Sequence, residues 1–173
     1  MGIDLEPKES TDAIESLGLS FELATLADVD DLLEFEQVDE VDNDSSQYSE
    51  ALKNRQEIYE LVEENKCYLI KNAGRIIGTA AYKVRSDNAV YIRNIYIARE
   101  YRAKGIARAA LVRLIAMNKG AKIFTLLTNP KNIVAIALYK QLGFKYAGSI
   151  TMTFPNRTFN ATEIALKMTK RVR

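Results

Sequence analysis

The spacing of apolar residues divides the chain into helical and extended segments. Apolar residues three and four apart are typical of helices, whereas alternation or a short apolar run between turn residues is typical of strands. Ser, Thr or Asn before a helical segment and Gly after it indicate the helix ends. The pattern predicts four helices: 25–37 after a Thr25–Asp28 capping box, 46–62 after Ser45 or Ser46, 104–118, and 129–143 with Asn129 as N-cap, Pro130 as first helical residue and Gly143 as C′.

Seven segments are β-rich, at residues 19–24, 66–71, 75–85, 89–98, 122–128, 144–154 and 159–170. Short turns at 72–74 and 86–88 predict three antiparallel neighbours, and the helix at 104–118 predicts a parallel pair with a right-handed crossover. We therefore predict one α/β domain, residues 18–173, with a mixed, mostly antiparallel sheet of six to seven strands and four main helices. Residues 1–17 are polar and acidic, and we expect a flexible or loosely packed arm there.

The formal net charge of +1 is the sum of two strongly charged halves. Residues 1–65 hold 20 acidic and 3 basic residues, a charge of −17, and residues 66–173 hold 3 acidic and 21 basic residues, a charge of +18. This separation indicates either a basic surface for an anion beside an acidic surface for a cation, or two halves that neutralise each other within the fold. The two interpretations can hold at once.

The chain has no histidine, and Cys67 is its one cysteine. Zinc sites, Ser-His-Asp triads, Cys-His dyads and internal disulfides are therefore excluded, and we expect no metal. The most apolar runs, such as 133–138, are far shorter than the ~18 residues of a membrane span, and no signal peptide is recognisable at the N-terminus. We expect a soluble, cytoplasmic protein with no membrane partner.

The segment from Arg102 to Arg108 lies between a predicted strand and a predicted helix. The first amides of a helix lack helical partners and carry the positive end of the helix dipole, and Gly105 would let an anion approach the backbone closely. Arg99, Arg102, Lys104 and Arg108 add side-chain charge that suits phosphates. An ordinary basic turn has the same pattern, because the segment lacks the glycines of a P-loop or of GxGxxG.

A second segment places Asn132, Ala135 and Tyr139 three and four residues apart, on one face of a predicted helix. Such a face could receive a thin, flexible ligand arm between two polar groups. A core helix with Tyr139 half-buried would have the same spacing. Taken alone, the spacing favours the core helix.

At this order and spacing, the two segments together resemble the GNAT superfamily of acetyl-CoA-dependent N-acetyltransferases. The element order from residue 19 to residue 170 agrees with that fold. The family pattern Arg/Gln-x-x-Gly-x-Gly/Ala is met by Arg102, Gly105 and Ala107. The later family signature is met by Asn132, Ala135, Leu138, Tyr139, Gly143 and Phe144.

The resemblance implies how acetyl-CoA would bind. The strand that ends at Ile97 and the strand from Lys122 would separate, and the pantetheine arm would pair with the backbone of Ile95 and Ile97. Asn132 would hydrogen-bond the pantetheine region, and Tyr139 would stand near the thioester sulfur. The pyrophosphate would bind the amides of Arg102, Ala103, Lys104, Gly105, Ile106, Ala107 and Arg108.

The resemblance also implies direct transfer from the thioester to an amine. The N–H of Ile97 would stabilise the tetrahedral oxyanion, and Tyr139 would give the departing thiolate its proton. Cys67 could in principle carry the acetyl group, but its apolar strand and the absence of histidine favour a buried structural thiol.

The base that accepts the amine proton is open. The predicted strand 89–98 contains no Asp or Glu, so the carboxylate that some relatives carry on this strand is missing. Water held by the backbone and by Tyr91, Asn94 or Tyr96 is one alternative. A carboxylate from the acidic helices, with Glu34 and Glu36 as candidates, is the other.

The acidic half suggests a cationic acceptor, because in this family it contributes two helices over the acceptor side of the cleft. A polyamine, an aminoglycoside-like amine, or a protein lysine or N-terminal amine would fit, although solvated or internally paired acidic helices have the same composition. The alternative function is a catalytically silent acyl-CoA sensor or partner-binding domain of this fold. Nucleic-acid binding is not expected, since no recognition signature is present. The oligomeric state, a homodimer included, is open.

Overall fold

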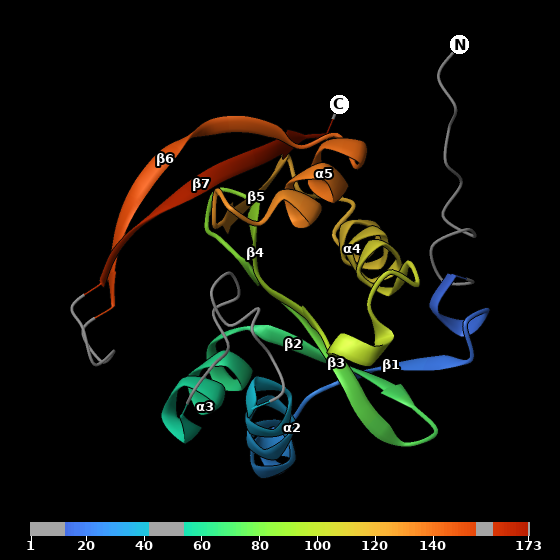
Figure 1. Ribbon diagram of the computed structural model, residues 1–173. Coiled ribbons are helices and arrows are strands. Elements are labelled where there is room, and N and C mark those ends of the chain that lie inside the picture. The colour runs from blue at the N-terminus through green and yellow to red at the C-terminus, as the bar shows by residue number, and fades with distance from the viewer. Residues whose placement is uncertain (1–12, 42–53, 155–160, 173) are drawn as a thin grey trace.

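The structure, a computed structural model, describes residues 13–41, 54–154 and 161–172. Within these ranges the chain forms one twisted sheet of seven strands with helices on both faces (Figure 1). The strand order is β1-β2-β3-β4-β5-β7-β6; β4 and β5 are parallel and the other neighbours are antiparallel, which confirms the predicted fold class. The strands are β1 (Leu19–Leu23), β2 (Lys66–Asn72), β3 (Arg75–Val84), β4 (Ala89–Ile97), β5 (Ile123–Thr128), β6 (Lys145–Phe154) and β7 (Ala161–Arg171).

Helices cover the two faces of the sheet over separate cores. Helices α2 (Val29–Val41) and α3 (Arg55–Glu64) bury Leu32 and Leu61 against Leu69 of β2 on one face. Helix α4 (Ile106–Met117) buries Leu111 on the other face, where Ile70, the next residue of β2, is fully buried. Adjacent strand residues serve opposite cores because side chains alternate along a strand. Helix α5 (Ile133–Gln141) packs Ile136, Leu138 and Tyr139 against the same core as α4.

The described chain begins with a segment that packs against the core. Residues 13–15 form a helical turn, and Ile14 is fully buried in the core under α4. Glu15 lies 4.0 Å from the guanidinium of Arg113 on α4. The end of the segment that the sequence assigns to an arm therefore contributes to the core, whereas residues 1–12 lie outside the described residues.

The two acidic helices begin at capping boxes. The N–H of Thr25 donates to the Asp28 carboxylate at 2.8 Å, and the 3-10 helix η1 (Leu26–Asp28) leads into α2, which continues four residues beyond the predicted end at Gln37. In α3, Oδ1 of Asn54 accepts from the N–H of Glu57 at 3.0 Å. The predicted unbroken helix over 46–62 is therefore wrong, because Asn54 is extended and caps the helix; the predicted caps Ser45 and Ser46 lie outside the described residues.

The predicted N-cap of α5 is also wrong. Oδ1 of Asn129 accepts from the N–H of Lys131 at 2.9 Å, which closes a turn over 129–131 instead of opening the helix. The N-cap is Asn132, whose Oδ1 accepts from the N–H of Ala135 at 3.3 Å. The predicted C′ residue is confirmed, since Gly143 has a φ of 86° and its N–H donates to Lys140 O at 3.0 Å.

Candidate functional site

Strands β4 and β5 pair over only part of their length. Their parallel pairing runs from Ala89 with Ile123 to Ile92 with Leu126. At that point the β4 register with β3 shifts, and Arg93 becomes the extra residue of a β-bulge. A bulge bends its strand, so β4 continues along β3 to Ile97 while β5 continues along β7. The pairing of the two strands therefore ends at Ile92, which agrees with the separation that the family resemblance implies.

The backbone of Ile95 and Ile97 faces this opening. The N–H of Ala98 donates to Ile77 O at 2.9 Å on the β3 side. Successive residues direct their backbone groups to opposite edges of a strand, so Ile97 and Ile95 present theirs on the β5 side. The carbonyl oxygen of Ile97 accepts from Nε of Arg102 at 2.8 Å.

Helix α4 begins with open amides just past the end of β4. Ala103 and Gly105 both have left-handed backbone, with φ of 58° and 78°, and no side chain caps the helix. The first helical bond closes from the N–H of Ala109 to Gly105 O at 3.0 Å, so the amides of residues 106–108 precede it. Alternating left- and right-handed residues make a concave set of N–H groups, and together with the helix start they suit an anion.

The basic side chains of this loop point in different directions. The Arg102 guanidinium turns back to Ile97 O and lies 5.7 Å from the Tyr96 ring centre, which ties the loop to the end of β4. Nζ of Lys104 lies 5.2 Å from the Tyr101 ring centre. Lys104 and Arg108 are exposed beside the open amides. The sequence assigns Arg102 to the anion directly; the structure gives it a backbone partner in β4.

Helix α5 carries Tyr139 and begins at its N-cap Asn132. The Asn132 side chain caps the helix. Tyr139 is half-buried, with its ring centre 6.1 Å from that of Phe144. Burial raises the pKa of Tyr139 to about 12, so its hydroxyl stays protonated and can donate a hydrogen bond at neutral pH.

The opposite face of β4 meets helix α2. Phe35 packs edge-on against Tyr96, with ring centres 5.8 Å apart. Nδ2 of Asn94, just past the bulge, donates to Oγ1 of the fully buried Thr79 at 3.0 Å. Both candidate carboxylate bases belong to α2. Glu34 is exposed, whereas Glu36 is buried, with 3% of its surface exposed.

Cys67 is buried on the α2 face of the sheet. It is 1% exposed, and burial, with a smaller contribution from the charge of Glu36, raises the pKa of its thiol to about 12. A thiol that stays protonated is a poor nucleophile. The environment of Cys67 therefore agrees with a structural role.

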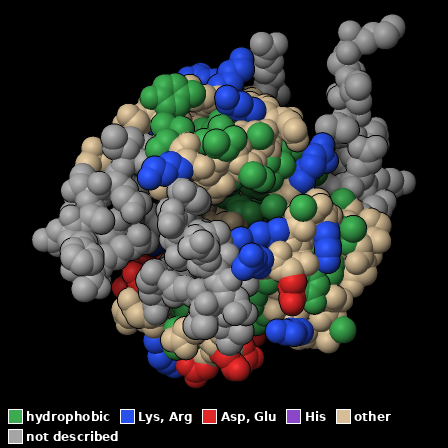
Figure 2. Space-filling model, in the orientation of Figure 1, with side chains coloured by type: hydrophobic (Ala, Val, Ile, Leu, Met, Phe, Trp, Pro, Cys, Tyr) green, Lys and Arg blue, Asp and Glu red, His purple; other side chains and the backbone are tan. Residues whose placement is uncertain are grey.

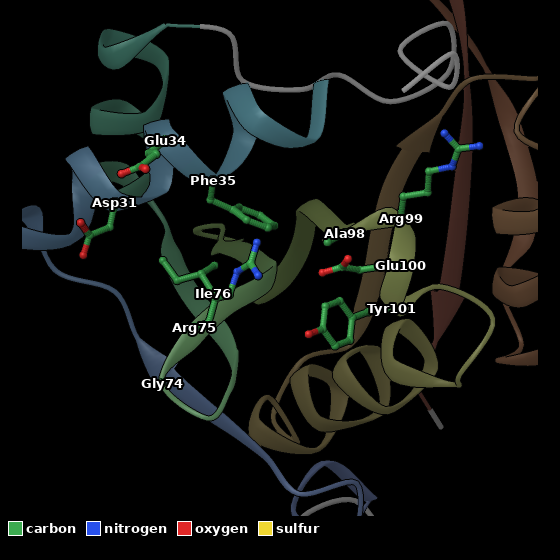
Figure 3. Close-up of a pocket in the computed structure, with 10 residues that line it drawn as sticks. All are labelled: Asp31, Glu34, Phe35, Gly74, Arg75, Ile76, Ala98, Arg99, Glu100 and Tyr101. Atoms are coloured by element: carbon green, nitrogen blue, oxygen red, sulfur yellow. The ribbon is translucent and has the colours of Figure 1, made fainter. Parts of the chain in front are cut away.

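A cavity of about 810 Å³ lies between α2 and the segment that joins β4 to α4 (Figure 3). No sequence pattern indicates it, because its walls come from segments far apart in the chain. Figure 2 shows acidic side chains gathered towards the α2–α3 end and Lys and Arg over the rest of this face. The cavity is lined by Asp31, Glu34, Phe35, Gly74, Arg75, Ile76, Ala98, Arg99, Glu100 and Tyr101.

Two further features of the described residues bear on the class of protein. Among them, no group of three or more His, Cys, Asp or Glu side chains could hold a metal ion. In the same part of the chain, no helix is long and apolar enough to cross a membrane.

Solved structures similar to this chain include several N-acetyltransferases. The ribosomal-protein-S18-alanine N-acetyltransferase of Escherichia coli aligns with a TM-score of 0.68 at 20% identity, over 88% of this chain and 93% of that one. Ard1 of Thermoplasma volcanium aligns with a TM-score of 0.69 at 17% identity, over 90% and 98%. The PaiA N-acetyltransferase of Thermoplasma acidophilum, solved with coenzyme A, aligns with a TM-score of 0.67 at 16% identity, over 89% and 99%. At these identities the likeness establishes the fold.

Sequence comparison identifies the family. No curated protein matches the chain. The family model described as "Acetyltransferase (GNAT) family" matches residues 29–144, which is more than half of the chain and includes both motifs. The predicted resemblance and the predicted class, an acyltransferase with acetyl-CoA as donor, are thereby confirmed. The chain belongs to the acetyltransferase (GNAT) family.

Proposed function

We propose that this protein transfers the acetyl group of acetyl-CoA directly to a primary amine that carries positive charge. The acceptor is a polyamine, an aminoglycoside-like amine, or a lysine or N-terminal amine of a protein. One observation carries the proposal: the unpaired edge of β4 leads straight to the open amides at the start of α4. The pantetheine arm of acetyl-CoA is extended and ends in phosphates, so it can pair with the β4 edge and place its phosphates on these amides.

The donor is held by backbone groups of β4 and α4. The pantetheine arm pairs with Ile95 and Ile97 in the manner of an added strand, and the pyrophosphate lies on the amides of 103–108, since the N–H of Arg102 already donates to Arg99 O at 3.2 Å. The bond from Arg102 to Ile97 O, 2.8 Å long, occupies part of this edge. When the pantetheine arm donates to Ile97 O, it replaces the bond from Arg102. The Arg102 guanidinium is then free to bind the phosphates, beside Lys104 and Arg108.

Transfer proceeds by attack of the neutral amine on the thioester carbonyl. A C–N bond forms, the tetrahedral oxyanion accepts a hydrogen bond from the N–H of Ile97, and the C–S bond then breaks to release the thiolate. Tyr139 donates to the sulfur. Because the pKa of Tyr139 is about 12, against ~8.5 for an alkyl thiol, its main effect is to stabilise the developing thiolate by a hydrogen bond.

The acceptor ammonium loses two protons in all: one before attack, which gives the neutral amine, and one from the nitrogen as the tetrahedral intermediate collapses, which gives the neutral amide. One of the two goes to the base, and the other ends on the CoA thiolate, which leaves as the thiol. The face of β4 towards α2 presents Asn94, whose Nδ2 is engaged by Thr79 at 3.0 Å. An amide held by its NH₂ group directs its carbonyl oxygen elsewhere, where it can accept from a water or from the amine. As the proton acceptor, a water relay held by Asn94 is therefore favoured over two side chains of α2, the buried Glu36 and the exposed Glu34.

An amine panel tests the proposal. The full chain is incubated with acetyl-CoA and spermidine, kanamycin, a lysine peptide, an alanine-starting peptide, propylamine or glutamate, and release of the free CoA thiol is followed. The alanine peptide belongs there because alanine N-acetyltransferases of ribosomal proteins have this fold. We expect turnover with cationic acceptors and the least with glutamate. Binding of acetyl-CoA without turnover on any amine would instead indicate a silent acyl-CoA sensor.

A further inference from the structure

The cavity between α2 and the β4–α4 segment begins beside the proposed transfer site. Ala98 lines it and directly follows Ile97, whose N–H is the proposed oxyanion donor. Phe35 connects the cavity to β4, since it lines the cavity and packs against Tyr96 of β4. A group bound in the cavity therefore lies close to the end of β4 and outside the amides assigned to the donor phosphates.

The cavity combines carboxylates with aromatic walls. Glu100, Phe35 and Tyr101 point towards its middle in Figure 3, whereas Asp31 and Glu34 lie on α2 at its rim with their carboxylates directed away from the middle. An organic ammonium is stabilised by carboxylates and by the faces of aromatic rings. These side chains therefore suit an ammonium on a short apolar stem.

The carboxylates of the cavity have no ion-pair partner in the described part of the chain. Neighbouring acids do have such partners: Asp30 pairs with Arg55 at 2.9 Å and Glu64 with Lys83 at 3.5 Å. Among the described residues, Asp31, Glu34 and Glu100 form no ion pair. Their charge acts on whatever enters the cavity.

Arg75 enters the same cavity from the start of β3 and carries the opposite charge. Its guanidinium points towards the middle, near Glu100 in the view of Figure 3, whereas Arg99 points away. Arg75 opposes a bound cation and would attract a bound carboxylate. Its replacement therefore tells the two kinds of ligand apart by the sign of the effect.

We infer that the cavity binds a second, non-reacting ammonium of the acceptor, so that the preferred acceptors are diamines and polyamines. This inference rests on the proposed function. The reacting amine reaches the end of β4 while the second ammonium lies between Glu100 and the α2 rim. A monoamine reaches the transfer site without this contact and reacts with a higher KM.

Four variants test the inference with spermidine and propylamine as acceptors. Glu100→Gln and Asp31→Asn should each raise the KM for spermidine about threefold to tenfold, leave kcat unchanged, and leave the KM for propylamine within about twofold. Arg75→Gln should lower the KM for spermidine by a similar factor. Asp30→Asn is the matched control, because it removes the same charge from the same helix outside the cavity; its effect should stay below about twofold.

Several results would overturn the inference. Equal shifts for spermidine and propylamine, or an equal shift from Asp30→Asn, would mean that only bulk charge matters. A higher KM in Arg75→Gln would indicate a carboxylate ligand. Calorimetric titration of spermidine into the protein loaded with coenzyme A, which carries no acetyl group to transfer, separates this inference from the proposed function. Binding weakened by Glu100→Gln, with no turnover in the separate acetyl-CoA assay, refutes only the function, whereas turnover without that weakening refutes only the cavity.

Discussion

Gly78 of β3 controls the position of the end of β4. It pairs with Ile97, and a Cβ built on it would lie 2.6 Å from the carbonyl oxygen of Tyr96 and 2.8 Å from Cδ1 of Ile97. The isoleucine side chain can rotate away. The carbonyl belongs to the strand whose open edge is the proposed binding edge, so Gly78→Ala must displace β4 itself.

The size of the displacement follows from the contact distances. Ordinary van der Waals contacts to a Cβ begin at 3.4 Å, so the Tyr96 carbonyl has to retreat by the difference from 2.6 Å, about 0.8 Å. Overpacking of this kind costs about 1–3 kcal/mol of stability. A shift approaching ~1 Å in a group that orients reactants can cost about 100-fold in rate. We expect Gly78→Ala to lose about 2 kcal/mol of unfolding free energy and about 10- to 100-fold in kcat/KM for acetyl-CoA.

Urea unfolding and thiol release measure the two effects separately. Gly120→Ala is the control, because Gly120 lies in the turn before β5, has no atom within 4 Å of a built Cβ and has no left-handed φ. It should change stability by less than about 0.5 kcal/mol and leave the rate unchanged. A Gly78→Ala protein that is destabilised, yet transfers acetyl at the wild-type rate under folding conditions, would refute the link between the β4 edge and the donor.

Three further predictions concern single side chains. Tyr139→Phe should lower kcat by about 100-fold at neutral pH, and because the pKa of Tyr139 is about 12, the wild-type rate should show no loss from its ionisation below about pH 10; an unchanged kcat removes the proposed donor role. Asn132→Ala should cost about 1 kcal/mol in urea unfolding through loss of the α5 cap and Asn132→Asp much less, so equal costs would contradict capping. Cys67, buried with a pKa of about 12, should resist thiol reagents in the native protein at about pH 8, and Cys67→Ala should keep full transfer; loss of turnover would point to an acetyl-cysteine.

Local signals predict most elements of the fold correctly. Thr25 and Asp28 form the capping box that their spacing indicates, and Gly143 adopts the left-handed conformation expected after a helix. The strand–helix–strand unit gives the parallel pair β4–β5. These features depend on residues that are near each other in sequence, where patterns carry the information.

The errors at helix starts arise from competition between neighbouring polar residues. Asn129 and Asn132 can both cap, and the choice is made by the turn that Asn129 closes with Lys131. The start of α3 had a usable signal, since Asn54 and Glu57 have capping-box spacing. The longer apolar pattern upstream obscured that signal.

The site itself is less predictable because its geometry is tertiary. The motifs located the open amides before α4, but the bulge at Arg93 depends on register with β3. The direction of Arg102 depends on a carbonyl that β5 has left unpaired. The cavity needs Arg75 and Glu100 to approach α2 from two separate turns. No local pattern could supply these three facts.

The described residues also bear on the two interpretations of the charge separation. Ion pairs between the acidic and basic halves of the described chain join Glu22 to Lys71, Glu64 to Lys83 and Glu15 to Arg113. In each of these pairs the carboxylate is at least half exposed, and exposed pairs contribute about 0–1 kcal/mol, so these three pairs stabilise the fold little. Among the described residues, exposed carboxylates such as Asp31 and Glu34 lie on α2, and the exposed bases Lys104 and Arg108 lie at the start of α4. A field of this kind favours an anionic donor at one end of β4 and a cationic acceptor beside it.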